Sequence, residues 1–186
     1  GSGNYLIDTK GRRFLDGVSS LWCNVHGHRH GALDKAIREQ LKKIAHATFL
    51  GLSHVPAIEL SKTLVEMAPR GLSKVFYSDS GSASVEVALK MAYQYWQLKG
   101  FPRKKIFLTL NNAYHGDTLG SVSVGGIKLF HTIYHPLLFK TLRVDAPYYY
   151  RDSFKGPERE YAAYCAEKIE KILKKHHHEI CALIVE

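Results

Sequence analysis

The chain has 186 residues, 45% of them hydrophobic, and a formal net charge of +9 with a pI near 9.4. This is enough apolar sequence for one large domain, or one domain and part of another, with a buried core. No long uncharged apolar run is present, which excludes a membrane-spanning helix. The first residues show no signal-peptide pattern, and Cys23, Cys165 and Cys181 lack the spacing of a disulfide framework or a zinc site. We therefore expect reduced thiols and a cytoplasmic location.

The excess of Lys and Arg permits a nucleic-acid-binding function without favouring it. The basic residues form short clusters along the chain, at Arg12-Arg13, Lys42-Lys43, residues 103–105 and Lys174-Lys175. No known nucleic-acid motif accompanies them, and such clusters are usually solvated helix faces or ends. An anionic small ligand would be served equally well by this charge balance. A basic RNA-binding domain stays open as a rival function.

Hydrophobic periodicity and turn residues divide the chain into alternating strands and helices. In chain order we expect a hairpin at residues 5–8 and 13–16, a loop at 18–30, helices at 33–44 and 58–67, a strand at 74–77, a helix at 85–96, a strand at 105–110, a helix at 157–176 and a strand at 181–185. This order predicts an α/β fold with a mostly parallel sheet and flanking helices, in which ligands bind at the carboxyl ends of the strands. The sequence stops where the last strand ends, so we expect a piece of a longer protein.

The stretch DSGS at residues 79–82 lies between a predicted strand and a predicted helix. A helix start offers unpaired N–H groups and the positive end of the helix dipole, so this turn could bind an anion. Gly81 would let the backbone approach an oxygen closely, and Ser80 and Ser82 would add hydroxyl donors. Ser and Gly also favour such positions for capping alone. A well-capped turn that binds nothing therefore stays open.

Two further stretches contain residues that could bind a ligand or a metal. In NNAYHGDT, at residues 111–118, an aromatic side chain follows a predicted strand. Such a residue can clamp a flat ring, which makes Tyr114 a candidate, although an ordinary loop tyrosine would explain it too. His26, His28 and His30 alternate, but no carboxylate or thiol accompanies them at ligand spacing. We predict no metal site there.

Five stretches, taken in order, resemble the class III, fold-type I family of pyridoxal-phosphate aminotransferases, and within it the branch that serves biotin synthesis. They are GRRFLDGVSSLWCNVHGH, IAHATFLGLSHVPAIEL, VFYSDSGSASVEVALKMAYQYW, NNAYHGDTLGSVSVG and EICALIVE. The resemblance runs along essentially the whole chain. It implies a transaminase that converts 8-amino-7-oxononanoate to 7,8-diaminononanoate, with S-adenosylmethionine or lysine as amino donor. It also implies a homodimer when the protein has its full length.

The resemblance assigns the site residues of this chain. It implies that Gly81 and Ser82 bind the phosphate of pyridoxal 5'-phosphate. It implies that Tyr114 stacks on the pyridine ring, and that His115 and Gly116 complete that wall. Substrate binding is implied for three residues: Trp22, Tyr114 and Asp117.

Two departures from the family pattern matter for function. Many members of this branch have paired tryptophans in the substrate-pocket segment, whereas this chain has Leu21 before Trp22. The amino donor therefore stays open. The family's Schiff-base lysine, and the aspartate that keeps the pyridine nitrogen protonated, lie downstream of the segment that ends at Glu186. We therefore expect no catalytic residue in this chain, and we expect Lys90 to be a solvated helix residue.

The resemblance also implies a domain division and leaves alternatives. Residues 1–30 would form the hairpin and substrate-pocket segment of a small domain, and residues 31–186 the first portion of the large cofactor-binding domain. One alternative is another class III ω-aminotransferase, of the ornithine or 4-aminobutyrate type. A second is a non-catalytic fragment that binds an anion.

Overall fold

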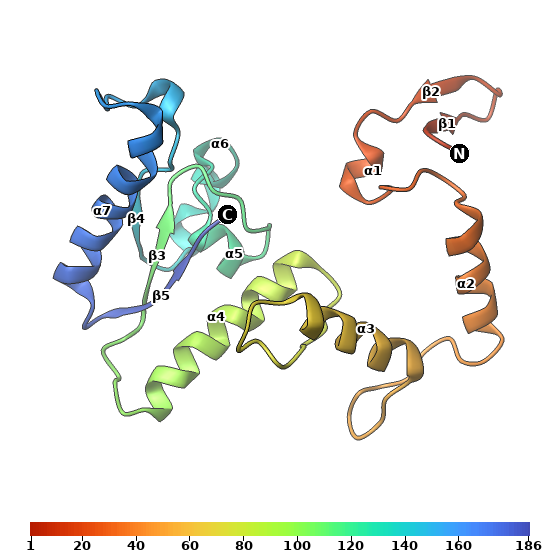
Figure 1. Ribbon diagram of the computed structural model, residues 1–186, viewed down its shortest axis with the longest axis horizontal. Coiled ribbons are helices and arrows are strands. Elements are labelled where there is room, and N and C mark those ends of the chain that lie inside the picture. The colour runs from red at the N-terminus through yellow and green to blue at the C-terminus, as the bar shows by residue number, and fades with distance from the viewer. The chain divides into compact units, whose positions relative to one another are not determined.

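The computed structural model describes residues 1–186, apart from the side chain of residue 130. Its contacts divide the chain into two compact units, Gly1–Val75 (unit 1) and Phe76–Glu186 (unit 2). Figure 1 shows the helices and strands of each unit. The division at residue 30 inferred from the family concerns the domains of the longer protein, so it stays a prediction.

Unit 1 starts with the expected hairpin. β1 (Tyr5–Ile7) pairs antiparallel with β2 (Arg13–Leu15), which confirms the prediction. The carboxylate of Asp8 holds the turn, because its Oδ1 accepts hydrogen bonds from the backbone N–H groups of Lys10 and Arg12, both at 2.9 Å. Arg12 also donates from Nε to the other carboxylate oxygen at 2.6 Å. The hairpin is thus fixed by polar bonds within its own turn.

The rest of unit 1 is helical. The segment predicted as a loop contains one short turn, α1 (Ser19–Trp22), in which φ is positive at every residue, between +48° and +69°. A left-handed turn of this kind has no helical apolar face, so hydrophobic periodicity cannot reveal it. The two predicted helices are confirmed as α2 (Gly31–Leu41) and α3 (Val55–Met67). Pro56 lies in the first turn of α3, where its missing N–H is harmless.

Unit 2 is built on a three-stranded parallel sheet in the order β4-β3-β5. The central strand β3 (Ile106–Leu110) pairs in parallel with both β4 (Thr141–Val144) and β5 (Ile180–Ile184). The sequence pattern predicts β3 and β5 but misses β4, because its four residues include Arg143 and form no apolar run. The predicted α/β fold with a parallel sheet is confirmed.

Helices cover both faces of this sheet (Figure 1). On one face Leu89, Phe107 and Val124 form a buried cluster between α4, α5 and the strands. On the other face α7 packs against Leu110 and Val144. The helical elements of unit 2 are α4 (Gly81–Leu98), α5 (Leu119–Val124), α6 (Lys128–His131), η1 (Thr132–Leu137), η2 (Tyr149–Arg151) and α7 (Glu158–His176). Of these, the sequence predicts α4 and α7.

The strand predicted at residues 74–77 is wrong. These residues belong to neither described sheet. Phe76 is 70% exposed, so it does not occupy the half-buried position that a strand side chain usually takes. β-Branched and aromatic residues favour a strand only where a neighbouring strand supplies hydrogen bonds, and no described strand does so here.

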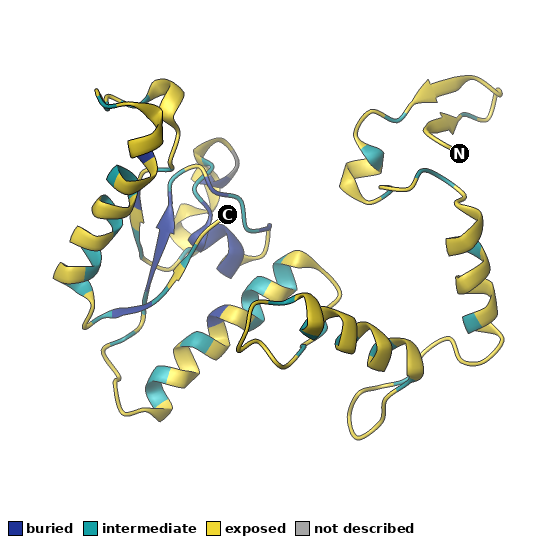
Figure 2. Cartoon of the chain, viewed as in Figure 1, coloured by how far each residue is buried: buried dark blue, intermediate teal, exposed yellow. Residues whose placement is uncertain are grey.

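The buried core lies in unit 2 alone. Figure 2 shows the buried residues in dark blue along β3 and α5, and all the buried residues of the described side chains have numbers from 89 upward. Leu108 and Val124, at 0% exposure, are the largest apolar side chains that are fully buried. Unit 1 therefore keeps its local shape through backbone and polar side-chain bonds rather than through a core.

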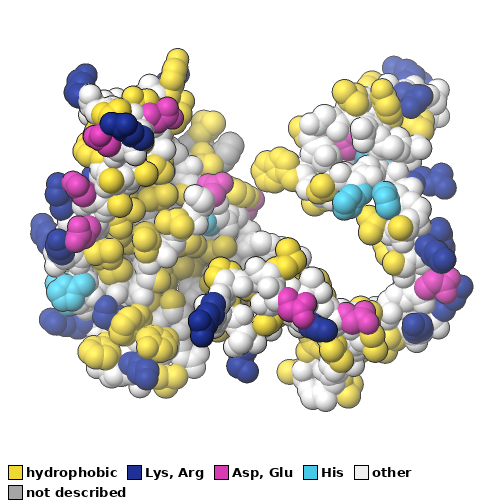
Figure 3. Space-filling view, in the orientation of Figure 1, with side chains coloured by type: hydrophobic (Ala, Val, Ile, Leu, Met, Phe, Trp, Pro, Cys, Tyr) yellow, Lys and Arg dark blue, Asp and Glu magenta, His cyan; other side chains and the backbone are white. Residues whose placement is uncertain are grey.

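Lys and Arg side chains are spread over each unit on the face that Figure 3 shows. A nucleic-acid site usually has a basic patch or stripe on one face. The RNA-binding function stays a rival prediction. Among the described residues, no helix is both long and apolar enough to cross a membrane.

Candidate cofactor and substrate site

The start of α4 leaves two backbone donors free. Ser80 is the N-cap, and its Oγ accepts a hydrogen bond from the N–H of Ala83 at 3.1 Å. The first backbone bond of the helix runs from Ser84 N to Ser80 O at 3.0 Å. The N–H groups of Gly81 and Ser82 precede it and have no partner within the described chain. They lie at the positive end of an 18-residue helix, which suits an anion.

Ser82 joins this helix start to the stretch at residues 111–118. Its Oγ accepts a hydrogen bond from the N–H of Asp117 at 3.0 Å, and its carbonyl accepts one from Ser121 Oγ at 3.3 Å. Because Ser82 Oγ is the acceptor in the first bond, its own O–H remains available to donate to an anion. The structure therefore brings together two stretches that the sequence analysis selected separately.

Two glycines permit this close approach. Gly116 has φ of +120°, and a Cβ built on it would collide with the side chain of Ser82. A Cβ on Gly120 would collide with the carboxylate of Glu86, which accepts a hydrogen bond from Gly120 N at 2.8 Å. Gly116 therefore has no room for a side chain beside Ser82, whereas at Gly120 the end of the Glu86 side chain would have to move. The segment from residue 116 to residue 120 thus lies directly against the first turns of α4.

Tyr114 is held by hydrogen bonds from its backbone and from its phenol. Its N–H donates to Glu186 Oε2 at 2.7 Å, and its hydroxyl donates to Asp117 Oδ2 at 2.8 Å. The hydrogen bond to Asp117 raises the pKa of Tyr114, with smaller contributions from burial and from the charge of that carboxylate. The phenol is therefore neutral near pH 7, and its ring has a fixed orientation beside the carboxyl ends of β3 and β5.

His115 has a buried nitrogen next to this tyrosine. Its Nε2 is shielded from solvent and has no hydrogen-bond partner among the described residues. Burial lowers the pKa of His115, and the charge of Glu186 opposes that shift in part. The ring is therefore neutral near pH 7.

Glu186 and Glu86 were not selected from the sequence. Glu186 directly follows β5, so the rule that ligands gather at the carboxyl ends of parallel strands could have indicated it. Glu86 gives no such signal, because a glutamate on a helix surface is ordinary. Only the three-dimensional contact with Gly120 reveals its part in holding α5.

The predicted substrate residue Trp22 belongs to unit 1, on the turn α1. Its side chain is 72% exposed, and that of Leu21 is 66% exposed. Both have left-handed φ angles, +64° at Leu21 and +69° at Trp22. For a residue other than glycine this conformation costs about 1–2 kcal/mol. Since α1 has four such residues in a row, other bonds must hold it.

Asp16 supplies these bonds. Its carboxylate accepts from Ser20 N at 2.9 Å, from Ser20 Oγ at 2.7 Å and from His28 Nε2 at 2.8 Å. The side chain of Asp16 is only 4% exposed. The two bonds from Ser20, followed by that from His28, lower the pKa of Asp16 to about 2. The carboxylate is therefore ionised throughout the physiological pH range.

The histidines at residues 26–30 show no metal geometry. His28 is engaged with Asp16, and the rings of His26 and His30 lie 5.6 Å apart at a tilt of 52°. Within the part of the chain that the structure describes, no three His, Cys, Asp or Glu side chains are grouped to hold a metal ion. The three cysteines form no disulfide there.

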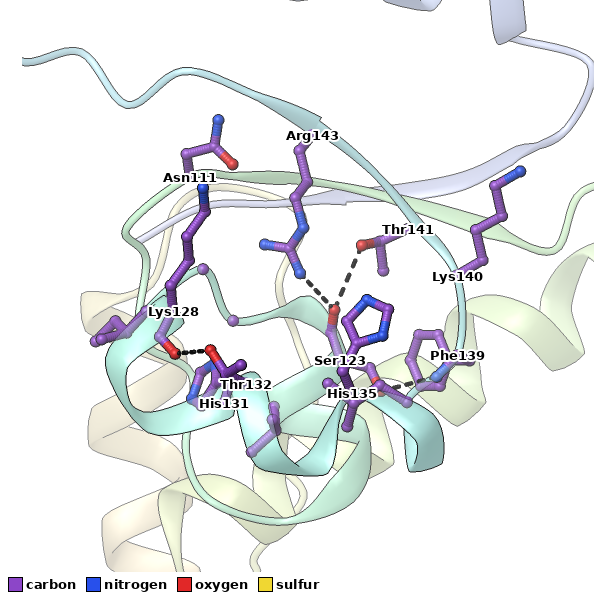
Figure 4. A pocket seen from close by; sticks show the side chains of 15 residues that line it. Asn111, Ser123, Lys128, His131, Thr132, His135, Phe139, Lys140, Thr141 and Arg143 are labelled. Carbon is purple, nitrogen blue, oxygen red and sulfur yellow. Dashed lines mark hydrogen bonds between the residues drawn. The ribbon is translucent and has the colours of Figure 1, made fainter.

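A cavity of about 400 Å³ lies elsewhere in unit 2, and none of the predicted site residues lines it. Figure 4 shows Lys128, Lys140 and Arg143 around this cavity. Arg143 Nη2 donates to the carbonyl of Ser123 at 3.0 Å, and Thr141 Oγ1 donates to the same oxygen at 3.4 Å. One donor group of the Arg143 guanidinium is therefore already engaged with the backbone. We place the candidate cofactor site at the contact of Ser82 with Asp117 instead.

Comparisons with known proteins show what this chain is similar to. The family model described as aminotransferase class-III matches residues 1–186. The chain is 53% identical to a protein of Nitratidesulfovibrio vulgaris named adenosylmethionine-8-amino-7-oxononanoate aminotransferase, over 99% of this chain and 34% of that protein. A Staphylococcus aureus protein of the same name is 51% identical, over 100% of this chain and 42% of that protein. The chain thus spans about a third to two-fifths of the length of these relatives.

Solved structures give the same result. The crystal structure of adenosylmethionine-8-amino-7-oxononanoate aminotransferase from Methanocaldococcus jannaschii has a TM-score of 0.86 and 43% identity, and covers 98% of this chain and 39% of that chain. An amine transaminase from an uncultivated Pseudomonas species, in its PLP-bound form, has a TM-score of 0.86 and 36% identity, over 100% of this chain and 43% of that chain.

Proposed function

Since the chain belongs to the class III aminotransferase family, we propose that it is part of a pyridoxal-phosphate-dependent transaminase that converts 8-amino-7-oxononanoate to 7,8-diaminononanoate. The observation that carries this proposal is the identity of 53% and 51% to two relatives named for that substrate, over nearly all of this chain. The same names include adenosylmethionine, which supports this compound over lysine as the amino donor.

The residues at the start of α4 fit the phosphate of the cofactor. Gly81 and Ser82 present two free N–H groups, and the Ser82 hydroxyl keeps a hydrogen to donate. A Cβ on Gly81 would meet no atom within 4 Å, so the space beside this turn is open. When bound, pyridoxal phosphate supplies the electron-withdrawing ring that stabilises the charge left by removal of the α-proton.

The other proposed residues would orient the ring and the substrate. Tyr114 would lie against the cofactor ring, and Glu186 and Asp117 hold it through the bonds to its N–H and its hydroxyl. His115 and Gly116 would complete that wall, and Asp117 would also face the substrate. Trp22 remains a proposed substrate contact on α1. Such placement of reacting groups contributes roughly 7–11 kcal/mol in favourable cases.

An ω-amine transaminase is the second candidate. Solved structures named amine or omega transaminases match with TM-scores up to 0.88, at 32% to 36% identity. The segment SSLWCNVHGH and the stretch HGDT of this chain disfavour this candidate. The higher identity to the Methanocaldococcus enzyme, 43%, places it second.

Location and assembly are further parts of the proposal. Three unpaired cysteines suit a reducing compartment, which supports a cytoplasmic location. The homodimer is implied by the family resemblance. The many exposed apolar side chains of unit 1, such as Leu50 at 90% exposure and Val25 at 78%, support the packing of this unit against further polypeptide.

Product analysis on the full-length protein tests the proposed function. The protein, loaded with pyridoxal phosphate, is given 8-amino-7-oxononanoate with S-adenosylmethionine or with lysine, and the products are identified by mass spectrometry. We expect 7,8-diaminononanoate with S-adenosylmethionine. Turnover of ornithine or 4-aminobutyrate without amination of 8-amino-7-oxononanoate would favour the second candidate. No amination of any acceptor by the cofactor-loaded protein would overturn both.

A further inference from the structure

The turn α1 concentrates unfavourable backbone conformations in one place. Ser19, Ser20, Leu21 and Trp22 all have φ between +48° and +69°. Elsewhere in the described chain, the non-glycine residues with positive φ are single ones, Arg29 and Asn112. A run of four persists only where surrounding groups impose it, and residues held in such strained conformations cluster at functional sites.

Asp16 connects this turn to the hairpin. It directly follows β2, and its N–H donates to the carbonyl of Asn4 at 2.9 Å, so its backbone is fixed. Its Oδ1 accepts from Ser20 N at 2.9 Å, inside the turn. Its Oδ2 accepts from the hydroxyl of the same serine at 2.7 Å. One carboxylate therefore fastens the middle of α1 to the end of β2.

His28 holds the carboxylate from the other side. Its Nε2 lies 2.8 Å from Asp16 Oδ2, and its backbone exchanges two hydrogen bonds with Gly3, at 2.7 Å and 3.1 Å. An ionised carboxylate only accepts, so Nε2 carries the hydrogen and Nδ1 is free to accept from Asn24 Nδ2, 3.5 Å away. His28 is thus anchored beside the N-terminal residues and orients Asp16 toward the turn.

The pose of Trp22 depends on this arrangement. Its side chain is 72% exposed and takes part in none of the ring contacts among the described residues. Packing within unit 1 therefore does not set its direction. The backbone of α1 sets it, and Asp16 holds that backbone through Ser20.

We propose that Asp16 and His28 are positioning residues, which hold α1 in its left-handed form and so fix the direction in which Trp22 meets the substrate. The inference rests on the proposed function, because it takes Trp22 as a substrate contact. Neither residue touches a reacting atom. Their effect is on substrate affinity through the geometry of the turn.

The test uses the full-length holoenzyme with the substitution Asp16→Asn, which cannot accept all three bonds at once. We expect the KM for 8-amino-7-oxononanoate to rise about tenfold, with kcat changed less than about threefold and cofactor affinity unchanged. Asp8→Asn is the matched control. Asp8 also binds two backbone N–H groups in the same hairpin but does not contact α1. We expect its KM to equal that of the unmodified enzyme.

A rescue variant separates the geometry of the turn from general stability. Glycine adopts positive φ without penalty, and the side chain of Ser19 forms no hydrogen bond within the described chain. Ser19→Gly added to Asp16→Asn should therefore restore most of the lost affinity. If it restores none while the protein is folded, the proposal is overturned. Should Asp16→Asn not fold, His28→Gln, which removes one bond, should raise KM in the same direction by a smaller factor.

A readout without turnover keeps this inference distinct from the proposed function. The enzyme is labelled with 5-fluorotryptophan, and the fluorine signal of Trp22 is assigned with Trp22→Phe. Asp16→Asn should shift or broaden that signal, whereas Asp8→Asn should not. An unchanged signal would overturn the positioning role, whichever substrate the enzyme uses. A changed signal with unchanged KM for every accepted substrate would overturn the link to substrate affinity, and failure of the unmodified enzyme to transaminate would be seen separately.

Discussion

The two candidate segments of this molecule are held by different forces. In unit 2, Ser82 lies on α4 and Tyr114 lies just after β3. Both elements contribute to the buried core around Leu89 and Leu108. In unit 1, Trp22 stands on a left-handed turn in a unit without a buried residue, and the carboxylate of Asp16 holds that turn. A rigid scaffold positions the first segment, and local hydrogen bonds position the second.

This difference predicts which property a substitution in each segment should change. On the scaffold of unit 2, a change of shape is resisted by packed neighbours, so it should affect stability and cofactor binding together. On the turn of unit 1, a lost hydrogen bond lets a few residues relax, so it should affect one substrate contact and leave the cofactor in place. Substitutions can therefore separate the two segments by their effects.

The largest effect should come from Gly116→Ala. The new Cβ would collide with Ser82, and φ of +120° is strongly unfavourable for alanine. We expect a loss of about 1–3 kcal/mol in the free energy of unfolding, together with weakened cofactor binding. Chemical denaturation and cofactor titration of the full-length enzyme measure both. Gly31→Ala, at the open start of α2, is the control and should change neither. Equal stability of the two variants would contradict the close contact.

Ser82→Ala should have a smaller effect, mainly on cofactor binding, although it also removes the acceptor of the Asp117 N–H bond. It removes the hydroxyl that we propose donates to the phosphate, and a hydrogen bond to a charged group is worth about 1.5–3 kcal/mol. We expect the cofactor dissociation constant to rise about tenfold or more. Ser84→Ala is the control, because Ser84 lies in the same helical turn but its hydroxyl is engaged with Ser80 O at 3.1 Å. Unchanged cofactor affinity in the Ser82 variant would remove the phosphate assignment.

Tyr114→Phe should spare cofactor binding and slow turnover. The ring remains, but the bond from its hydroxyl to Asp117, 2.8 Å long, is lost, so the ring and the carboxylate are both less well oriented. We expect kcat to fall roughly three- to tenfold, which is less than the ~1.5–3 kcal/mol that such a bond is worth, because the bond orients the ring in the ground state as well as in the transition state. Tyr150→Phe, at a side chain that is 80% exposed, should leave kcat unchanged. A Tyr114 variant with full kcat would show that the ring alone suffices.

The same hydrogen bond predicts how Tyr114 titrates. Because the bond to Asp117 raises the pKa of Tyr114, its stabilising effect is complete below the ordinary tyrosine pKa of about 10 and is lost as pH rises through the raised value. The ultraviolet absorbance of tyrosinate, compared between the unmodified enzyme and Tyr114→Phe, isolates this group. We expect the difference to titrate later than an ordinary tyrosine. Titration at the ordinary value would mean that the bond does not form in solution.

The sequence predicts those parts of the fold that carry their own pattern. Apolar periodicity reveals α4 and α7, and continuous apolar runs reveal β3 and β5. It cannot reveal α5, whose residues are buried on almost every side and so show no amphipathic period. The strand expected at residues 74–77 fails for the opposite reason, since its composition favours a strand but no described strand pairs with it.

The residues of the candidate site also fall into those that local sequence indicates and those that only the folded structure reveals. Rules about helix starts and strand ends, which depend on local sequence alone, make Ser82 and Tyr114 candidates, and the family resemblance gives them their proposed roles. Residue 116 must be glycine because it contacts Ser82, and no sequence pattern indicates that contact. The role of Asp16 is hidden likewise, because hydrogen bonds to Ser20 and His28 become visible only when the turn is folded. The residues proposed to contact cofactor or substrate are thus easier to predict from the sequence than the residues that hold them in place.

Lys90→Ala should have the smallest effect of all. Lys90 is exposed, and it lies eight residues after Ser82 on α4, roughly 12 Å along the helix axis. A lysine that reacts with the cofactor must reach the ring while Ser82 holds the phosphate, and a solvated side chain two turns further along is poorly placed for that. Borohydride reduction of the full-length enzyme with pyridoxal phosphate, followed by peptide mapping, should therefore find the adduct on another lysine, with kcat unchanged in the variant. If the adduct formed on Lys90 and Lys90→Ala abolished turnover, the proposed phosphate site at Ser82 would be contradicted. The reactive amine would then come from α4 itself.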